Sequence, residues 1–220
     1  MSIKQNLNNI KNTLPEHVTL VAVSKTKPVS DLMEAYNAGQ RIFGENKIQE
    51  MAGKHEQMPK DIEWHMIGHV QRNKVKYMAP FVGLIHGVES FKLLKEINKQ
   101  ALKHNRVIDC LLQIKIAEEE SKFGMRPEEA KNILLSQDFS ALKNIKVTGV
   151  MGMATFTDNT EQIEKEFKLL KATFDTLITL KTENCKLQTI SMGMSGDYQL
   201  AIACGSTMVR VGSSIFGYRN

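Results

Sequence analysis

The sequence predicts an α/β protein with a (β/α)8 barrel, the TIM-barrel fold, in one domain over residues 1–220. Eight short strand-like segments alternate with seven helix-like segments along the chain, which is the pattern of parallel α/β folds. The strands are rich in Val, Ile and Leu, as strands covered on both faces are. A length of 220 residues fits one barrel near its minimum size. A doubly wound open sheet is the alternative.

The first half of the pattern opens with a polar helix, expected over residues 1–13. Strands are expected at 18–24, 41–43, 62–67 and 81–86, with helices at 30–38, 47–56 and 70–78. Ser30 has the side chain of an N-cap, Gly39 is a stop signal, and Pro80 cannot continue a helix. These signals set the helix boundaries.

The second half repeats the alternation, with strands expected at 107–114, 146–150, 187–191 and 207–211. Ser90 is expected to cap the helix that follows strand four, and Pro127 to open a later helix at its first position. A long helix is expected over 160–181, with apolar residues at spacings of three and four, and a shorter one over 197–204. The longest irregular stretch, 115–126, has a length that is often functional in a compact domain.

Composition excludes several classes of protein. The net charge of +5 comes from 29 basic and 24 acidic residues, and the lysines are spread over expected helix surfaces without an aromatic-rich basic cluster. We therefore expect no nucleic-acid partner, although positive charge would help to recruit a phosphate-bearing ligand. Cys110, Cys185 and Cys204 are far apart, which fits buried thiols in a reduced compartment. Without a signal-peptide pattern or a membrane-length apolar segment, the expected location is the cytoplasm.

A lysine, Lys25, directly follows the first apolar strand. An ammonium group at the mouth of a buried strand is costly unless it is paired, has a shifted pKa or forms a covalent bond. Desolvation lowers the pKa of a lysine and gives the neutral amine that attacks carbonyl groups. The alternative is an ordinary surface lysine just past a strand end. Lys27, two residues on, is expected to point outward or towards the rim of a ligand site.

Phosphate sites in these barrels favour the loops after strands seven and eight. Ser195 follows strand seven, while Gly212 and Ser213 follow strand eight and offer closely spaced backbone N–H groups. Gly193 and Gly196 would let the backbone approach a phosphate. Ser195 could bind an anion or merely cap the next helix. A lysine facing a phosphate site suggests a Schiff base to a phosphorylated aldehyde.

An arginine, Arg210, lies within the apolar last strand. Strand alternation puts it on the same face as Met208 and Gly212, which is the barrel interior. A buried guanidinium needs a partner, either a carboxylate in an internal salt bridge or an acceptor on a ligand. The residues leave both alternatives open.

Other residues are weaker candidates. His65 and His69 are four apart but straddle a strand end and lack the glutamate of a zincin helix, so we expect no metal site. The methionines near the strand ends are expected to fill core and pocket-wall space: Met151, Met153, Met192 and Met194.

Five segments closely resemble the pyridoxal phosphate homeostasis protein family, in order, from about residue 5 to the C-terminus. They are VAVSKTKP at 21–28, FGEN at 43–46, HMIGHVQRNK at 65–74, SMGMS at 191–195 and GSTMVRVGSSIFG at 205–217. One departure is Val70, where a leucine is more common, and the change is conservative.

The resemblance implies a barrel similar to the N-terminal domain of alanine racemase, with pyridoxal 5'-phosphate (PLP) held as a Schiff base on Lys25. It further implies that Arg210 lies near the pyridine nitrogen and that Asn46 is on the cofactor side. Phosphate contacts would come from Ser195, Gly212 and Ser213. Lys122, in the long loop, also matches the family, without an assigned role.

The same resemblance implies a PLP-binding protein of intracellular vitamin B6 homeostasis, with effects on amino-acid pools. PLP racemases of this fold take a second acid/base from a second domain and a dimer partner. The sequence ends nine residues after Val211, so we expect no such domain. An arginine beside the ring nitrogen would also weaken the ring as an electron sink. We therefore expect little or no catalytic turnover.

Two alternatives remain: a single-domain PLP-dependent racemase or decarboxylase, and a Schiff-base aldolase acting on a phosphosugar. We further expect a cytoplasmic monomer that binds neither nucleic acid nor membrane. Apo PLP-dependent enzymes are its candidate clients.

Overall fold

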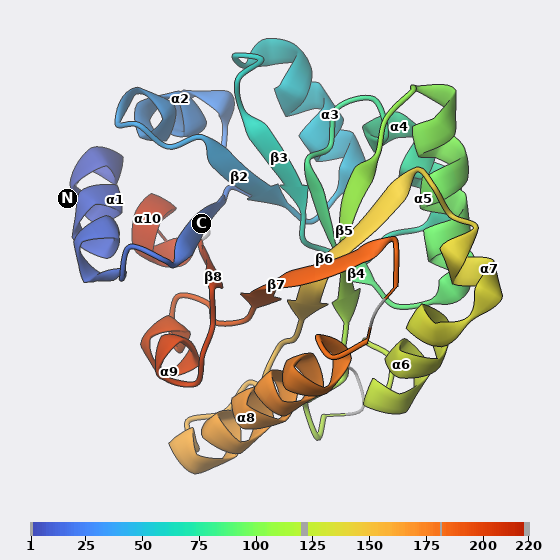
Figure 1. Ribbon diagram of the computed structural model, residues 1–220. Coiled ribbons are helices and arrows are strands. Elements are labelled where there is room, and N and C mark those ends of the chain that lie inside the picture. Colours follow the sequence, from blue (N-terminus) through green and yellow to red (C-terminus); the bar gives the residue numbers. More distant parts are fainter. Residues whose placement is uncertain (1, 120–122, 181, 218–220) are drawn as a thin grey trace.

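The chain forms a closed barrel of eight parallel strands, in which each strand pairs with the next and β8 pairs with β1 (Figure 1). The computed structural model describes residues 2–119, 123–180 and 182–217. The strands are β1 Thr19–Val23, β2 Ile42–Glu45, β3 Glu63–Met66, β4 Leu84–Val88, β5 Ile108–Gln113, β6 Ile145–Met151, β7 Cys185–Ser191 and β8 Met208–Val211. The predicted barrel is thus confirmed, and the open-sheet alternative is wrong because the sheet has no free edge.

Helices surround the barrel on its outer side (Figure 1). They are α1 Ile3–Thr13, α2 Val29–Asn37, α3 Ile48–Gln57, the 3-10 turn η1 Arg72–Lys74, α4 Val75–Met78, α5 Phe91–Lys103, α6 Pro127–Leu135, α7 Gln137–Ser140, α8 Thr160–Leu177, α9 Tyr198–Ala203 and α10 Ser213–Phe216. Ser90 caps α5 as predicted, since its side chain accepts from the N–H of Leu93, and Pro127 opens α6. Ser30 is not a cap, because α2 begins one residue earlier, after Pro28.

Some predicted boundaries are wrong for local reasons. The helix expected over 70–78 is reduced to η1 and α4, and α7 and α10 were not predicted. Strand four begins later than expected because the N–H groups of Phe81 and Val82 both donate to the carbonyl of Met78 and close α4. The backbone hydrogen bonds between β3 and β4 begin at Gly83, whose N–H donates to the carbonyl of Trp64.

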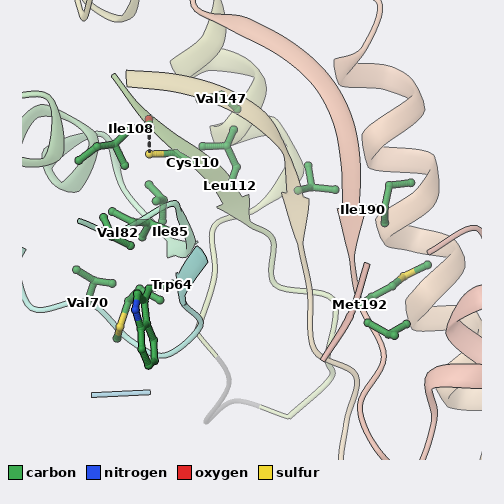
Figure 2. Packing of buried hydrophobic residues seen from close by; sticks show 14 of the residues in the cluster. Trp64, Val70, Val82, Ile85, Ile108, Cys110, Leu112, Val147, Ile190 and Met192 are labelled. Atoms are coloured by element: carbon green, nitrogen blue, oxygen red, sulfur yellow. Dashed lines mark hydrogen bonds between the residues drawn. The ribbon is translucent and has the colours of Figure 1, made fainter. Parts of the chain in front are cut away.

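The hydrophobic core has two layers. The larger lies between the outer faces of the strands and the helices, where Trp64, Ile85, Cys110 and Ile190 are packed (Figure 2). The smaller fills the barrel interior with residues from five strands: Val21, Leu84, Leu111, Met151 and Met208. Of the three free cysteines only Cys110 is buried; the prediction of buried thiols is wrong for the half-buried Cys185 and Cys204. No helix in the described ranges combines the length and apolar character needed to span a bilayer.

Candidate functional site

A cavity of about 700 Å³ opens where the strands end, within the usual size range for small-molecule sites. Its lining includes all six residues that the sequence singled out for ligand binding: Lys25, Asn46, Ser195, Arg210, Gly212 and Ser213. They come from β8 and from the segments that follow β1, β2, β7 and β8. The barrel therefore brings the two ends of the sequence to one site.

Lys25 is held by a turn of unusual backbone conformation. The next residue, Thr26, has φ of 65°, in the left-handed region that non-glycine residues rarely adopt. The N–H of Thr26 donates to Oε1 of Glu50 at 2.6 Å. Lys54 Nζ donates to the same oxygen at 2.8 Å and to the carbonyl of Ser24 at 2.8 Å. The residues on both sides of Lys25 are thus fixed by contacts to α3.

Lys54 is also paired with a buried carboxylate, that of Glu45. Lys54 Nζ lies 2.7 Å from Oε1 of Glu45, which also accepts from the hydroxyl of Ser24 at 2.6 Å. Burial raises the pKa of Glu45, while the hydrogen bonds from Lys54 and Ser24 act in the opposite direction. We call Ser24, Glu45, Glu50 and Lys54 the Lys54 clamp. Glu45 belongs to the FGEN motif, and its structural role was not anticipated from the sequence.

Asn46 lies in the cavity wall at the end of β2. The backbone beside it is packed closely, because a Cβ on Gly68 would lie 2.4 Å from the carbonyl oxygen of Asn46. A Cβ on Gly87 would lie 2.5 Å from the carbonyl oxygen of Gly68. Only glycine fits at these two positions, which sequence reasoning did not single out.

The loops after β7 and β8 are joined to each other in the cavity wall. The N–H of Gly212 donates to Oγ of Ser195 at 3.2 Å. Ser195 does not cap α9, since Asp197 is the residue at the N-cap position and no side chain caps this helix; that alternative is wrong. The hydroxyl proton of Ser195 can instead be donated into the cavity. The first N–H groups of α10, at Ser213 and Ser214, have no acceptor inside their helix.

Arg210 is buried at the floor of the cavity. Its Nη1 donates to the carbonyl of Ser191 at 2.8 Å and to Oγ of Ser191 at 2.6 Å, and its Nη2 donates to the carbonyl of Gly152 at 3.1 Å. No carboxylate in the described part of the chain forms a salt bridge with it, so the geometry does not support an internal ion pair. Burial lowers the pKa of Arg210 to about 10, with Asp197 acting in the opposite direction. The guanidinium remains charged at neutral pH.

The cavity has a basic lining. Lys25, Lys27, His69 and Arg210 contribute to it, and no aspartate or glutamate stands among the described lining residues. Such a lining suits an anionic ligand. The two histidines of the HMIGHVQRNK segment are separated: His65 is buried in the barrel, whereas His69 lies at the cavity.

The rim of the cavity is apolar. Phe123 stacks on His69 with ring centroids 4.8 Å apart, and Phe156 is 93% exposed. Met153 and Met194 also line the cavity, as predicted. The end of the loop over 115–126 returns to β5, since the N–H of Met125 donates to the carbonyl of Gln113 at 2.8 Å. Lys122 lies outside the described residues.

The whole chain, residues 1–220, matches the family model of the alanine racemase N-terminal domain. It is 37% identical to the pyridoxal phosphate homeostasis protein of Haemophilus influenzae, over 100% of this chain and 97% of that protein. It is 39% identical to the protein of the same name from Aquifex aeolicus, over 91% of this chain and 86% of that protein. The chain belongs to the pyridoxal phosphate homeostasis protein family. The resemblance found in the five sequence segments is confirmed.

Solved structures agree with this assignment. PipY of Synechococcus elongatus, solved with PLP bound, is 32% identical and superposes with a TM-score of 0.89, over 98% of this chain and 100% of that chain. Alanine racemase from E. faecalis is 17% identical, with a TM-score of 0.75, over 99% of this chain and 58% of that chain. At that identity the racemase shares the fold alone, as predicted for the barrel.

Proposed function

We propose that this chain binds PLP in the cavity, as a Schiff base on Lys25, and serves PLP homeostasis with little or no catalytic turnover. One observation carries the proposal: Lys25, the buried Arg210 and a group formed by Ser195, Gly212 and Ser213 line the same cavity. We call this last group the anion site, because its hydroxyl and N–H groups suit a phosphate. The PLP-bound PipY, 32% identical over nearly the whole chain, supports the choice of cofactor. We further propose that the protein acts as a cytoplasmic monomer and that apo PLP-dependent enzymes are its clients.

The cavity offers groups that fit three of the polar parts of PLP: its phosphate, its ring nitrogen and its aldehyde. The Ser195 hydroxyl and the N–H groups of Ser213 and Ser214 suit a phosphate. Three of the five N–H groups of Arg210 donate to Ser191 and Gly152 within the described structure, which leaves two for the ring nitrogen. Lys25 supplies the amine. When bound, PLP supplies an aldehyde carbon and an electron-withdrawing ring.

The same residues favour binding of the cofactor over catalysis with it. Arg210 donates and carries a positive charge, so it disfavours protonation of the ring nitrogen and weakens electron withdrawal. Besides Lys25 and Arg210, the titratable groups among the described lining residues are Lys27 and His69. His69 Nδ1 is 3.2 Å from Oε1 of Glu89, and it is the group through which the enzyme alternative would operate.

The attachment site is tested by reducing the PLP-loaded protein with borohydride and mapping the pyridoxyl adduct by mass spectrometry. We expect the adduct on the peptide that contains Lys25 and its loss in Lys25→Ala. Lys27→Ala is the matched control, because Lys27 lines the same cavity two residues away and the variant should retain the adduct. An adduct that persists in Lys25→Ala, or is lost only in Lys27→Ala, would refute the assignment.

Turnover is tested by incubating the PLP-loaded protein with single L-amino acids in deuterated water and following α-proton exchange and chirality. General acid–base assistance contributes about 10²–10⁴-fold, so at most slow exchange is expected, reduced further in His69→Gln. Transfer is followed by the reactivation of an added apo PLP enzyme. Racemisation at about 1–10³ per second would support the enzyme alternative instead.

A further inference from the structure

A row of side-chain hydrogen bonds crosses the barrel interior beneath the cavity. It joins Glu63 Oε1 to His65 Nε2 at 2.9 Å, His65 Nδ1 to His86 Nε2 at 3.0 Å, and His86 Nδ1 to Ser191 Oγ at 3.0 Å. Arg210 Nη1 donates to the same Ser191 oxygen at 2.6 Å. Every member except Glu63 is at most 4% exposed, whereas the Glu63 side chain is 54% exposed. We call this row the histidine relay; it connects the cavity floor to solvent beyond the other end of the barrel.

The two ends of the relay fix the direction of every hydrogen bond. Arginine can only donate, so the Ser191 oxygen is an acceptor towards Arg210. In the described structure the other partner of the Ser191 hydroxyl is His86. The hydroxyl proton therefore goes to Nδ1 of His86, because it would otherwise be a buried donor without an acceptor. His86 then carries its own proton on Nε2 and donates to His65 Nδ1. His65 in turn donates from Nε2 to the Glu63 carboxylate, which can only accept when ionised.

Only neutral histidines satisfy this arrangement. A second proton on His86 would sit on Nδ1 and face the hydroxyl proton of Ser191. A second proton on His65 would face the Nε2–H of His86. Burial lowers the pKa of His86 well below its usual value, and the positive charge of Arg210 acts in the same direction, as a proton gained by His65 would. The hydrogen bond from His65 lowers the pKa of Glu63 and keeps it an acceptor.

The charged groups around the relay come from three further positions. Asp109 on β5 interacts with Glu63 and with Lys146 on β6 at the exposed end, and burial raises the pKa of Asp109. Asp197, before α9, interacts with Arg210 at the cavity end. No described carboxylate contacts His86, whose side-chain partners are His65 and Ser191. Protonation of His86 therefore lacks a compensating charge.

We propose that His86 and Ser191 are positioning residues for PLP, which hold Arg210 against the ring nitrogen and loosen that contact when a relay histidine gains a proton. This inference rests on the proposed PLP function of the cavity. It assigns a role to residues that do not line the cavity, and it couples cofactor retention to acidity.

The first test needs no cofactor. The ¹⁵N chemical shifts of the histidine rings in the cofactor-free protein should show His65 and His86 as neutral Nε2–H tautomers at pH 8. An Nδ1–H tautomer of His86, or a doubly protonated ring, would overturn the proposed direction of the relay.

The stability of the folded protein should also depend on pH through His86. Because the folded pKa of His86 is lowered from an unfolded value of about 6.5, the stabilising contribution of neutral His86 is present above pH 6.5. It is lost progressively as the pH falls from about 6.5 towards the folded pKa.

The second test follows release of PLP from the loaded protein at pH 5.5 to 8. Ser191→Ala removes the link between His86 and Arg210, and we expect release about 3- to 10-fold faster at pH 8, the usual effect of one hydrogen bond. The difference from the unmodified protein should shrink as the pH falls, because acid breaks the relay in both. Ser206→Ala is the matched control: its buried hydroxyl contacts only backbone carbonyls in the described structure, between the same strands.

A conservative variant separates positioning from folding. In His86→Asn the side-chain oxygen can take the place of Nδ1 and accept the Ser191 proton, but it does not titrate. We expect release close to the unmodified rate at pH 8, with a weaker dependence on acid, whereas His86→Leu should release PLP as fast as Ser191→Ala. Unchanged release and pH profiles in all variants of a protein that binds PLP would overturn this inference alone. Failure of the unmodified protein to bind PLP would instead overturn the proposed function.

Discussion

Thr26 adopts a backbone conformation that costs energy, and its surroundings explain why the cost is tolerated. A non-glycine residue in the left-handed region is stable only where neighbouring contacts over-determine it. The Lys54 clamp provides such contacts on both sides of Lys25, through Ser24 and Glu50. A lysine that must meet an aldehyde gains from this arrangement, because a fixed backbone reduces the conformational freedom lost on binding.

The variant Lys54→Met tests the clamp. It removes a buried charge whose partner, Glu45, is 0% exposed, and a carboxylate left alone in that position costs about 3–5 kcal/mol. We expect a lower free energy of unfolding by that amount, measured by denaturant titration. We also expect a smaller fraction of PLP bound covalently at a fixed PLP concentration, measured by absorbance.

Two further variants show whether the effect passes through the clamp. The double variant Lys54→Met with Glu45→Gln should recover part of the lost stability, because it removes the stranded charge. Glu56→Gln is an exposed change on the same helix and should alter neither quantity. Covalent loading that remains normal in Lys54→Met would show that Lys25 does not depend on the clamp.

The functional role of a single residue could be predicted where the pattern of its own strand indicated that role. Lys25 and Arg210 were found because a charged side chain interrupts or ends an apolar strand. His86 and Ser191 drew no functional hypothesis as individual residues, since their roles depend on a contact between β4 and β7 inside the closed barrel. Lys54 was missed because a lysine on a helix is usually a surface residue, and nothing in α3 itself indicates its buried partner.

At the scale of elements, the N-terminal helix supports the anion site. Figure 1 shows α1 beside α10, and the side-chain amide of Asn6 donates to the carbonyl of Ile215 at 3.0 Å. Leu7 is fully buried in the core. Since α10 begins at Ser213, α1 helps to set the position of the N–H groups proposed to bind phosphate.

Leu7→Ala should therefore affect both stability and cofactor binding. The loss of a buried leucine side chain costs about 2–5 kcal/mol, to be measured as a shift in the denaturant midpoint. PLP should also be released faster, because α10 loses part of its support. Asn8→Ala, an exposed change on the same helix, is the control and should change neither. A loss of stability with unchanged PLP release would confine α1 to a purely structural role.

The predictability of the elements follows from their length and packing. The eight strands are short apolar runs, and the longer helices have apolar residues at spacings of three and four, so the order of these elements was predicted correctly. The four-residue helices α7 and α10 are too short to show a period of 3.6. The start of β4 could not be read from apolar character alone, since Val82 is as apolar as a strand residue but closes α4 through its hydrogen bond to Met78.

At the scale of the whole molecule, closure of the barrel creates the site. Lys25 follows β1 and Ser213 follows β8, nearly 190 residues apart in sequence, and they share one cavity because β1 pairs with β8. The interior below is filled by the cluster around Leu111 and by the histidine relay. A ligand that contacts both ends of the chain should stabilise the folded state as a unit.

This leads to a prediction for thermal unfolding. A ligand at 100 times its dissociation constant, binding only the folded state, adds about 2.7 kcal/mol. For a domain of this size each kcal/mol raises the midpoint by about 2–4 °C, so saturating PLP should raise it by about 5–11 °C in a calorimetric scan. Pyridoxal keeps the aldehyde but lacks the phosphate, so at equal concentration it should give a clearly smaller rise. Arg210→Ala should reduce the PLP-dependent rise without abolishing it, since Lys25 and the anion site remain. An equal rise with pyridoxal would mean that the loops after β7 and β8 do not bind the phosphate, and the anion site would then have to be sought elsewhere on the barrel.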